Sequence, residues 1–365
     1  MPANFDLAAL GIGGVCPGNE ILYDDKGLPS IMVKIPKMTY AQLGMGASTA
    51  VHPAFIINGS EVDAIYISKY QNIVKDGRAY SLPAEDPKAN ITFDSARQAC
   101  ESKGEGWHIM TRMEWGLLVR WCQANGVMPK GNNNYGKHTS ETVYKAIPKT
   151  YGTGADAGKI FHTATGTGPL TWYHDQSPSG IADLCGNVSE WMGGIRTVKG
   201  ELQILANNNA ADSDHSQAAA SDQWKAIKAS DGTLITPDGI GTTVGSIKMD
   251  WVSSKLTYAD EITEAAANRG NHNCTFANVV CAVGVSDAAK LLLQDLGMLM
   301  YGSDAELFSG QNVYFNNKED ERFFLSGGLY NSSTYGLASF YGYNARSYTL
   351  GNIGFRAAFA SLPSA

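Results

Sequence analysis

The side chains best suited to metal binding or nucleophilic attack are scattered along the chain. The six cysteines form no CxxC pair, and the seven histidines show no HExxH spacing. Close spacing of this kind is what brings ligands together in a metal site. We therefore predict neither a catalytic residue nor a metal ligand, and we favour buried free thiols for Cys16, Cys100, Cys122, Cys185, Cys274 and Cys281.

One polar cluster has the oxygen chemistry that calcium prefers. Asp183, Asn187 and Glu190 lie in the tight segment 180–191, and they could bind calcium through side-chain and backbone oxygens. Short motifs of this kind often match by chance. We favour the alternative in which the three residues cap turns and satisfy buried amides, with a structural calcium ion as the one cofactor alternative.

A tyrosine-rich segment near the C-terminus has the composition of a binding surface. Residues 329–349 are rich in Tyr, Ser, Gly and Asn. Tyr offers a large contact area at low entropic cost, and Ser, Gly and Asn offer adaptable hydrogen bonds, as in antibody paratopes. The predicted ligand-binding residues are Tyr330, Asn331, Ser332, Ser333, Tyr335, Leu337, Ser339, Phe340, Tyr341, Tyr343 and Asn344.

Two apolar, glycine-containing stretches flank this segment and can hold it in place. Gly327, Gly328 and Gly354 permit close backbone approach. We expect Arg356 to pair with a carboxylate or with carbonyl groups beneath the site. The apolar residues are expected to anchor two adjacent strands in the core, and they are Phe323, Phe324, Leu325, Ile353, Phe355 and Phe359.

The overall composition excludes several classes of protein. With 365 residues and 44% hydrophobic content the chain can bury a full core, and 40 glycines with only 17% charged residues indicate a loop-rich protein and not a helical bundle. A net charge of −7 argues against a nucleic-acid partner. No run of eighteen apolar residues is present, so no membrane span is expected.

The N-terminus lacks the charged and apolar regions of a signal peptide. We therefore expect synthesis in a cytoplasm, from which the protein could leave inside a larger particle.

Periodicity and capping signals predict the main elements. Strands are expected over 31–40, 54–57 and 64–70, with helices over 93–102 and 286–296. A further helix follows Thr111, because Thr111 and Glu114 form a capping-box pattern and Gly126 ends the apolar repeat. Residues 126–171 are predicted to be loop, and the segment 180–191 to end in a short strand.

Several blocks of sequence resemble, in order, the formylglycine-generating enzyme (sulfatase-modifying factor) version of the C-type lectin fold. The resemblance covers about 54–365, loosely over 195–320. The similar blocks are 65–70, 91–100, 107–115, 180–191, 324–328 and 352–357.

The chain departs from those enzymes where their catalysis takes place. They use one cysteine just upstream of the final block and one directly after its Gly-Phe-Arg. Here Ala357 occupies the second position, and no cysteine follows Cys281. Thiol or copper-thiolate chemistry requires that sulfur, so we expect a protein that is not an enzyme.

A second branch, the variable proteins of diversity-generating retroelements, lacks those cysteines and is more similar. It includes phage receptor-binding tropism determinants and bacterial surface proteins, whose variable segment lies between the last two blocks. The resemblance implies an α+β, C-type lectin-like fold of the formylglycine-generating-enzyme type with irregular, loop-rich insertions. The expected organisation is an N-terminal extension (1–50) and one domain (51–365) with an insertion at about 195–320 and a variable binding segment at 329–349.

The function expected from this resemblance is non-enzymatic receptor binding through a diversified C-terminal surface. The partner would be a protein or glycan ligand on a target cell surface. Two alternatives remain, namely a formylglycine-generating or related oxidase, and a structural virion or surface protein whose tyrosines pack against neighbouring subunits.

Overall fold

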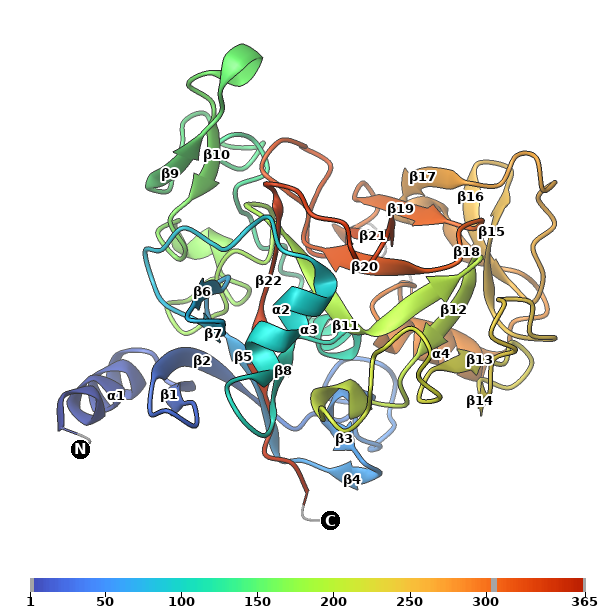
Figure 1. The fold of residues 1–365 in the computed structure, drawn as a ribbon, viewed down its shortest axis with the longest axis horizontal. Helices are drawn as coiled ribbons and strands as arrows, with labels where there is room; N and C mark the ends of the chain where they lie inside the picture. Colours follow the sequence, from blue (N-terminus) through green and yellow to red (C-terminus); the bar gives the residue numbers. More distant parts are fainter. Residues whose placement is uncertain (1–2, 303–306, 364–365) are drawn as a thin grey trace.

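Residues 3–302 and 307–363 are described by the computed structural model, which is sheet-rich with few helices (Figure 1). One five-stranded sheet has the order β1-β2-β5-β23-β8. Its strands are β1 (Asn19–Tyr23), β2 (Pro29–Pro36), β5 (Ala64–Ser68), β23 (Ala357–Phe359) and β8 (Trp107–Ile109).

The larger sheet has twelve strands and carries most of the second half of the chain. Its main path is β17-β19-β21-β20-β11-β12-β15-β16-β18, with β13, β14 and β22 attached beside it. These strands are β11 (Ser189–Val198), β12 (Glu201–Ile204), β13 (Lys225–Ile227), β14 (Leu234–Ile235), β15 (Lys248–Val252), β16 (Lys255–Ala259), β17 (Asn271–Thr275), β18 (Val279–Cys281), β19 (Asn312–Asn316), β20 (Arg322–Ser326), β21 (Phe340–Asn344) and β22 (Ile353–Phe355).

Three small hairpins and several short helical turns complete the β-structure and its connections. The hairpins are β3 (Ile56–Ile57) with β4 (Ser60–Glu61), β6 (Ile73–Lys75) with β7 (Arg78–Tyr80), and β9 (Pro148–Tyr151) with β10 (Ile160–Thr163). The 3₁₀ turns are η1 (Pro53–Phe55), η2 (Gly154–Asp156), η3 (Leu170–Trp172), η4 (Asn209–Ala211) and η5 (Phe276–Asn278).

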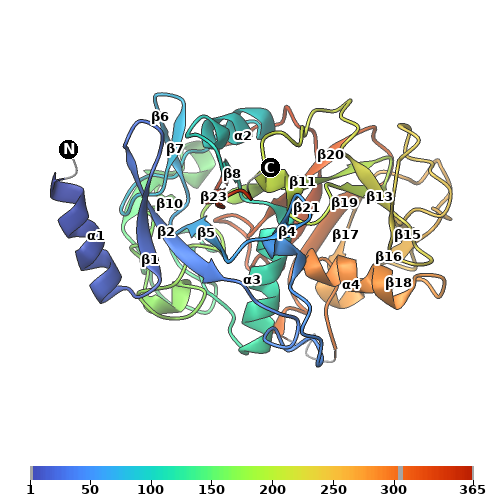
Figure 2. The same ribbon diagram turned by 90° about the horizontal axis from the view of Figure 1, so that it is seen from below.

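The described α-helices are α1 (Ala3–Val15), α2 (Phe93–Glu101), α3 (Arg112–Ala124) and α4 (Asp287–Asp295). Local sequence explains where the last three begin. Thr92 and Ser286 cap α2 and α4, and Thr111 and Glu114 form the predicted capping box of α3. The predicted helices over 93–102 and 286–296 and the one after Thr111 are therefore confirmed. Figure 2 shows α1 standing at one end of the molecule, beside β1.

Three local predictions need correction. The stretch 126–171 is not all loop, because it contains the β9–β10 hairpin, which projects from the body in Figure 1. The strand at the end of the segment 180–191 is not short, since β11 continues to Val198. The apolar flanks do not form two adjacent strands, because β11 lies between them, antiparallel to β20 and parallel to β22.

The main hydrophobic core crosses the boundaries predicted at residues 50 and 195. Leu43 and Met45, from the predicted N-terminal extension, belong to the same buried cluster as Trp115. Met249 and Leu256, from the predicted insertion, belong to it as well. The strand β2 also pairs directly with β5. Both predicted additions therefore share the packing of the central body.

The chain passes from the larger sheet to the five-stranded sheet at one residue, Arg356. It is the single residue between β22, in the larger sheet, and β23, in the smaller sheet. The Arg356 side chain is fully buried and donates two hydrogen bonds of 2.9 Å to the Glu190 carboxylate on β11. It also donates to the Ser68 carbonyl at 2.7 Å and to the Ala182 carbonyl at 2.9 Å. The predicted pairing of Arg356 is confirmed.

Replacing Glu190 with Gln is expected to lower the free energy of unfolding by about 3–5 kcal/mol, because it leaves the buried Arg356 cation without its counter-charge. Chemical denaturation measures the loss. Lys290→Gln, in the exposed pair of Lys290 with Asp287, is the matched control and should change stability by less than about 1 kcal/mol. Equal, small effects of the two substitutions would contradict the role given to the buried pair.

Candidate ligand-binding face

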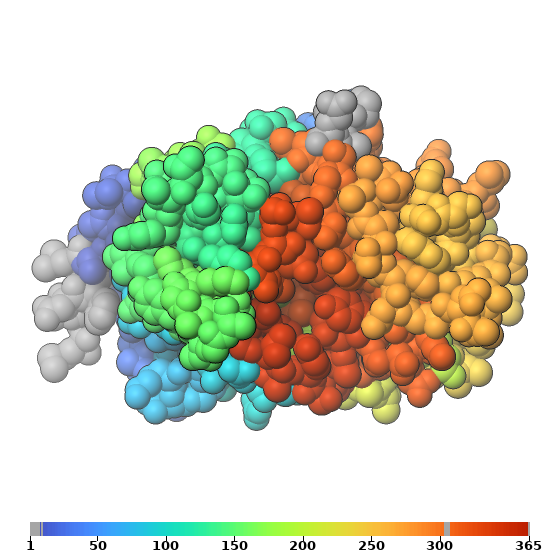
Figure 3. All heavy atoms as spheres, turned by 90° about the horizontal axis from the view of Figure 1, so that it is seen from above, coloured from blue at the N-terminus to red at the C-terminus, as the bar shows by residue number. Residues whose placement is uncertain are grey.

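The tyrosine-rich segment 329–349 consists of a loop followed by a central strand. Its second half contains β21, which pairs antiparallel with β20 and parallel with β19. In Figure 3 the red C-terminal residues form the middle of one face. The green surface of the region around the β9–β10 hairpin lies on one side of them, and the yellow-to-orange surface of the region around β15–β18 lies on the other. The red surface is hollowed near its centre.

Burial divides the eleven predicted binding residues into two groups. Asn331 and Ser333 are exposed, and Ser332, Tyr335 and Tyr343 are half-buried. The remaining six are buried, so their side chains add little to the exposed surface of the segment. These six are Tyr330, Leu337, Ser339, Phe340, Tyr341 and Asn344. That the segment binds a ligand stays a prediction.

The burial has a structural cause. A central strand has neighbours on both edges and covers the core with one face. Leu337 and Phe340 pack in the main core, and Phe276 meets Phe340 edge-on with ring centroids 6.0 Å apart. Tyr341 instead lies in the second core cluster, beneath the half-buried Tyr335 and Tyr343.

Four tyrosines from three parts of the chain form a continuous aromatic cluster. The ring of Tyr341 stacks on Tyr314 at 5.3 Å and meets Tyr335 edge-on at 5.1 Å. Tyr343 lies 5.9 Å from Tyr314. These are favourable aromatic geometries. Tyr314 comes from β19, inside the predicted insertion, and it was missed because only the parallel pairing of β19 with β21 brings it here.

A small cleft opens beside this aromatic cluster, with a volume of about 90 Å³. Tyr335, Tyr341 and Tyr343 line it, and Ser189 of β11 contributes from the larger sheet. The other lining residues are Leu325, Leu329, Asn344, Tyr348, Leu350, Asn352 and Ile353, so no charged side chain of the described chain lines the cleft.

A loop that carried no functional signal in the sequence supports the segment from one side. The Tyr135 amide donates to the Tyr330 carbonyl at 2.7 Å, and Asn133 donates to the Tyr335 carbonyl at 3.0 Å. The Tyr330 ring stacks on Phe161 of β10, with centroids 4.3 Å apart. The loop that contains Asn133 and Tyr135 therefore holds one side of the segment 329–349 in place.

Helix α3 supports the segment from below. Trp115 donates its indole N–H to the Leu337 carbonyl at 2.8 Å. The fully buried Arg112 donates to Ser326 Oγ at 2.5 Å and to the Leu296 and Gly297 carbonyls, just after α4, at 2.7 and 2.8 Å. Burial lowers the pKa of Arg112 to about 9. The negative end of the α4 dipole compensates part of this buried charge.

Close contacts at two glycines also fix the backbone on either side of the segment 329–349. Gly328 has a φ of +77°, and a Cβ atom there would lie 2.3 Å from the Tyr335 Cβ. A Cβ on Gly354 would lie 2.7 Å from the Lys88 carbonyl oxygen. The tight approach predicted for these glycines is confirmed.

The oxygens of the polar cluster at 183–190 are already engaged by the protein. Glu190 binds Arg356, and Asn187 Oδ1 accepts from the Thr163 amide at 2.8 Å. Asp183 Oδ2 accepts from the Gly166 amide at 2.8 Å. Calcium needs six to eight free oxygen ligands, so these residues do not fit the calcium alternative. Within 3–302 and 307–363, no group of three or more His, Cys, Asp and Glu side chains could hold a metal ion.

The six cysteines are free thiols, and four of them are buried as predicted, whereas Cys16 and Cys281 are half-buried. Burial raises the pKa of Cys185 to about 12 and that of Cys281 to about 11. A raised pKa keeps a thiol protonated and poorly nucleophilic at neutral pH.

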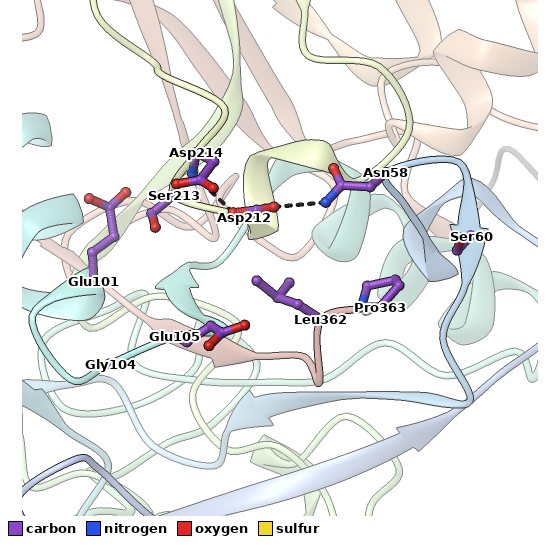
Figure 4. Close-up of a pocket in the computed structure, with 10 residues that line it drawn as sticks. All are labelled: Asn58, Ser60, Glu101, Gly104, Glu105, Asp212, Ser213, Asp214, Leu362 and Pro363. Atoms are coloured by element: carbon purple, nitrogen blue, oxygen red, sulfur yellow. Dashed lines mark hydrogen bonds between the residues drawn. The ribbon is translucent and has the colours of Figure 1, made fainter. Parts of the chain in front are cut away.

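A larger cavity, of about 930 Å³, lies on the side where the C-terminus emerges (Figure 4). Glu101, Glu105, Asp212 and Asp214 line it, and the Asp212 carboxylate accepts from the side-chain amide of Asn58 at 2.7 Å. No cation lines this acidic hollow, and all its lining residues belong to the described chain. It shares no lining residue with the cleft beside the tyrosine cluster, so size alone does not mark the candidate site.

Asp183→Asn is expected to remove a pH dependence of stability. Burial raises the pKa of Asp183 to about 6 from an ordinary value of 3.8, so the folded protein binds this proton more tightly than the unfolded chain does. The contribution to folding is therefore complete below pH 3.8 and is lost as the pH rises to about 6. It amounts to about 1–3 kcal/mol.

Urea unfolding of both proteins across this pH range measures the difference in slope. Asn keeps the acceptor for the Gly166 amide and tolerates the φ of +59° at this position. Asp63→Asn, at a carboxylate whose side chain is 98% exposed, is the control and should keep the wild-type slope. An unchanged slope in Asp183→Asn would show that this carboxyl does not titrate as described.

No helix within the described residues is both long and apolar enough to span a membrane. The chain matches no protein-family model and no curated protein sequence. Among solved structures it is similar to Treponema denticola variable protein 1, with 11% identity over 94% of this chain and 100% of that one and a TM-score of 0.32.

Two further solved structures are similar at the same level. PvdO from Pseudomonas aeruginosa shares 13% identity over 94% of this chain and 99% of its own, with a TM-score of 0.31. A Major Tropism Determinant P3c variant shares 10% identity over 94% of this chain and 71% of its own, with a TM-score of 0.29. At these scores the similarities assign neither a fold nor a function to this chain.

Proposed function

We propose that this protein is a non-enzymatic ligand-binding protein that displays a diversified surface on residues 329–349. The observation that carries the proposal is the tyrosine cluster around an uncharged cleft, in a segment held by Trp115 of α3, by Asn133 and by the pairing of β21 with β20. Tyrosines on a rigid support bind well because little conformational entropy is lost on contact.

The separation of buried from exposed residues within 329–349 supports sequence variation at the exposed positions. Buried residues such as Phe340 and Leu337 fix the backbone, whereas Asn331, Ser333 and Tyr348 are exposed. Exposed substitutions away from special features usually change stability by less than about 0.5 kcal/mol. The exposed positions can therefore vary without unfolding the frame.

The proposed architecture is the C-type lectin-like fold of the formylglycine-generating-enzyme type, over about 51–365. The ordered sequence blocks support it, as does the position of Arg356 between the last two strands. The raised thiol pKa values of Cys185 and Cys281 and the alanine at position 357 support a role without thiol catalysis. The proposed partner is a ligand on a target cell surface, met from a virion or from a bacterial surface.

Combined alanine substitution of Asn331, Ser333 and Tyr348 is expected to weaken binding to target cells by roughly tenfold or more, because exposed tyrosines often supply a large share of binding energy. The folded frame should remain, with a change in the free energy of unfolding of about 0.5 kcal/mol or less per substitution. Flow cytometry of fluorescently labelled protein on a panel of bacterial cells measures binding, and thermal melting measures stability.

Two control variants make this experiment interpretable. Tyr151→Ala, at an exposed tyrosine of β9, should leave cell binding unchanged. Phe340→Ala should lower stability by about 3–5 kcal/mol, because it leaves a cavity in the core. Loss of stability or assembly in the triple variant, with binding unaffected, would instead favour the structural alternative.

The coding DNA gives an independent prediction. An imperfect copy of the segment encoding residues 329–359, differing only at adenines, should lie near the gene and beside a reverse-transcriptase gene. The differing codons should fall on exposed or half-buried positions such as Asn331 and Tyr343, and not on Phe340. Sequencing the flanking genome tests this, and the lack of any such copy would count heavily against a diversified surface.

A further inference from the structure

Two hydroxyl groups beside the cleft have no hydrogen-bond partner among the residues that the structure describes. Ser189 and Tyr341 both line the cleft, and they are 1% and 2% exposed. Neither Ser189 Oγ nor Tyr341 Oη forms a hydrogen bond within the described residues. The Tyr335 and Ser339 hydroxyls are near enough to influence the pKa of Tyr341, but the geometry of a hydrogen bond is not reached.

Such unpaired groups lower the stability of the folded protein, and two of them at one opening indicate a ligand site. A buried donor or acceptor without a partner costs about 1–3 kcal/mol, and folded proteins leave few of them. Here two come from different strands, β11 and β21, and meet at one opening. Convergent polar groups in an otherwise apolar cleft are typical of small-molecule sites.

The lining defines the chemistry that the cleft can accept. All eleven lining residues are uncharged, so the cleft offers no counter-charge to an ionic ligand. Asn344 and Asn352 add amide groups to the two hydroxyls, and the tyrosine rings add flat apolar walls. A matching ligand is neutral, carries several neighbouring hydroxyl groups and has an apolar C–H face.

The size of the cleft limits how much of a ligand enters. Its volume of about 90 Å³ is small beside the roughly 300–1,000 Å³ of typical small-molecule pockets, so only part of a ligand enters. This space takes the edge of one sugar ring with its hydroxyl groups, and it does not take a length of peptide backbone. A single Ser or Thr side chain would enter, but it brings only one hydroxyl group for two unpaired ones.

We propose that this cleft binds one neutral saccharide residue, with Ser189 and Tyr341 hydrogen-bonding its hydroxyl groups. The inference rests on the proposed function, since it names the ligand class for the same face. Both protein hydroxyls lie just beneath the surface, so entry of the sugar requires the half-buried ring of Tyr335 or Tyr343 to move. Side-chain movements of this size are common at binding sites.

The test uses the full chain and a panel of neutral monosaccharides as methyl glycosides, with one acidic sugar for comparison. Saturation-transfer NMR identifies the sugars that bind, and NMR titration measures their affinity. At least one neutral sugar should bind, and Ser189→Ala and Tyr341→Phe should each weaken its binding by roughly three- to tenfold. Neither variant should have a lower melting temperature than the wild type, because each removes a group that is unpaired in the free protein.

Matched controls are Ser254→Ala and Tyr151→Phe, which lie outside the cleft and should leave sugar binding unchanged. Absence of binding by every neutral sugar, or unchanged affinity in both cleft variants, would overturn the proposal, as would preference for the acidic sugar. If labelled protein binds cells through Tyr348 while no sugar binds, the proposed function survives and this inference fails, with a protein ligand as the remaining interpretation. If a sugar binds as described and the cells are not bound, the cell-surface role fails instead.

Discussion

The buried pair of Arg356 and Glu190 is the interaction on which the rest of the structure depends. Arg356 occupies the one-residue step between β22 and β23, and its guanidinium reaches β11 in one sheet and the end of β5 in the other. A planar guanidinium suits this place because it can satisfy a carboxylate and two carbonyl groups at once. Both sheets are therefore fixed relative to each other beside β22, the strand that follows the tyrosine-rich segment.

This rigid attachment explains why the segment 329–349 can present an aromatic surface. The β20–β21 pairing, the Trp115 contact from α3 and the Asn133 contact from the loop hold different points of the same segment. These supports use backbone carbonyls of the segment in two cases, so they do not depend on which side chains the segment carries. A frame that binds backbone tolerates variation at its exposed positions.

The acidic cavity of Figure 4 and the cleft beside the tyrosine cluster differ in chemistry as well as in size. The larger one is acidic, and its Asp212 is already bonded within the protein. The smaller one is uncharged and holds two unpaired hydroxyls among tyrosine rings. Unsatisfied hydrogen-bonding capacity is a stronger indication of ligand binding than volume is, because a ligand recovers free energy that the free protein lacks.

The sequence by itself determined the local features and one long-range pair. The capping box at Thr111 and Glu114, the cap at Thr92 and the need for glycine at 328 and 354 follow from neighbouring residues and backbone geometry. A carboxylate or carbonyl partner for Arg356 was predictable because a buried arginine must be paired, although the sequence did not single out Glu190.

Only the tertiary structure decided which parts of the binding segment face solvent. Tyrosines at 330, 341 and 343 look alike in the sequence, yet the first two are buried and the third is half-buried. Tyr341 is buried because β21 became a central strand by pairing with β19, more than twenty residues upstream, and the same pairing brought in Tyr314. Tyr330 lies outside β21, and its ring stacks on Phe161 of β10. Composition predicts a binding segment, whereas burial depends on strand neighbours that no local pattern specifies.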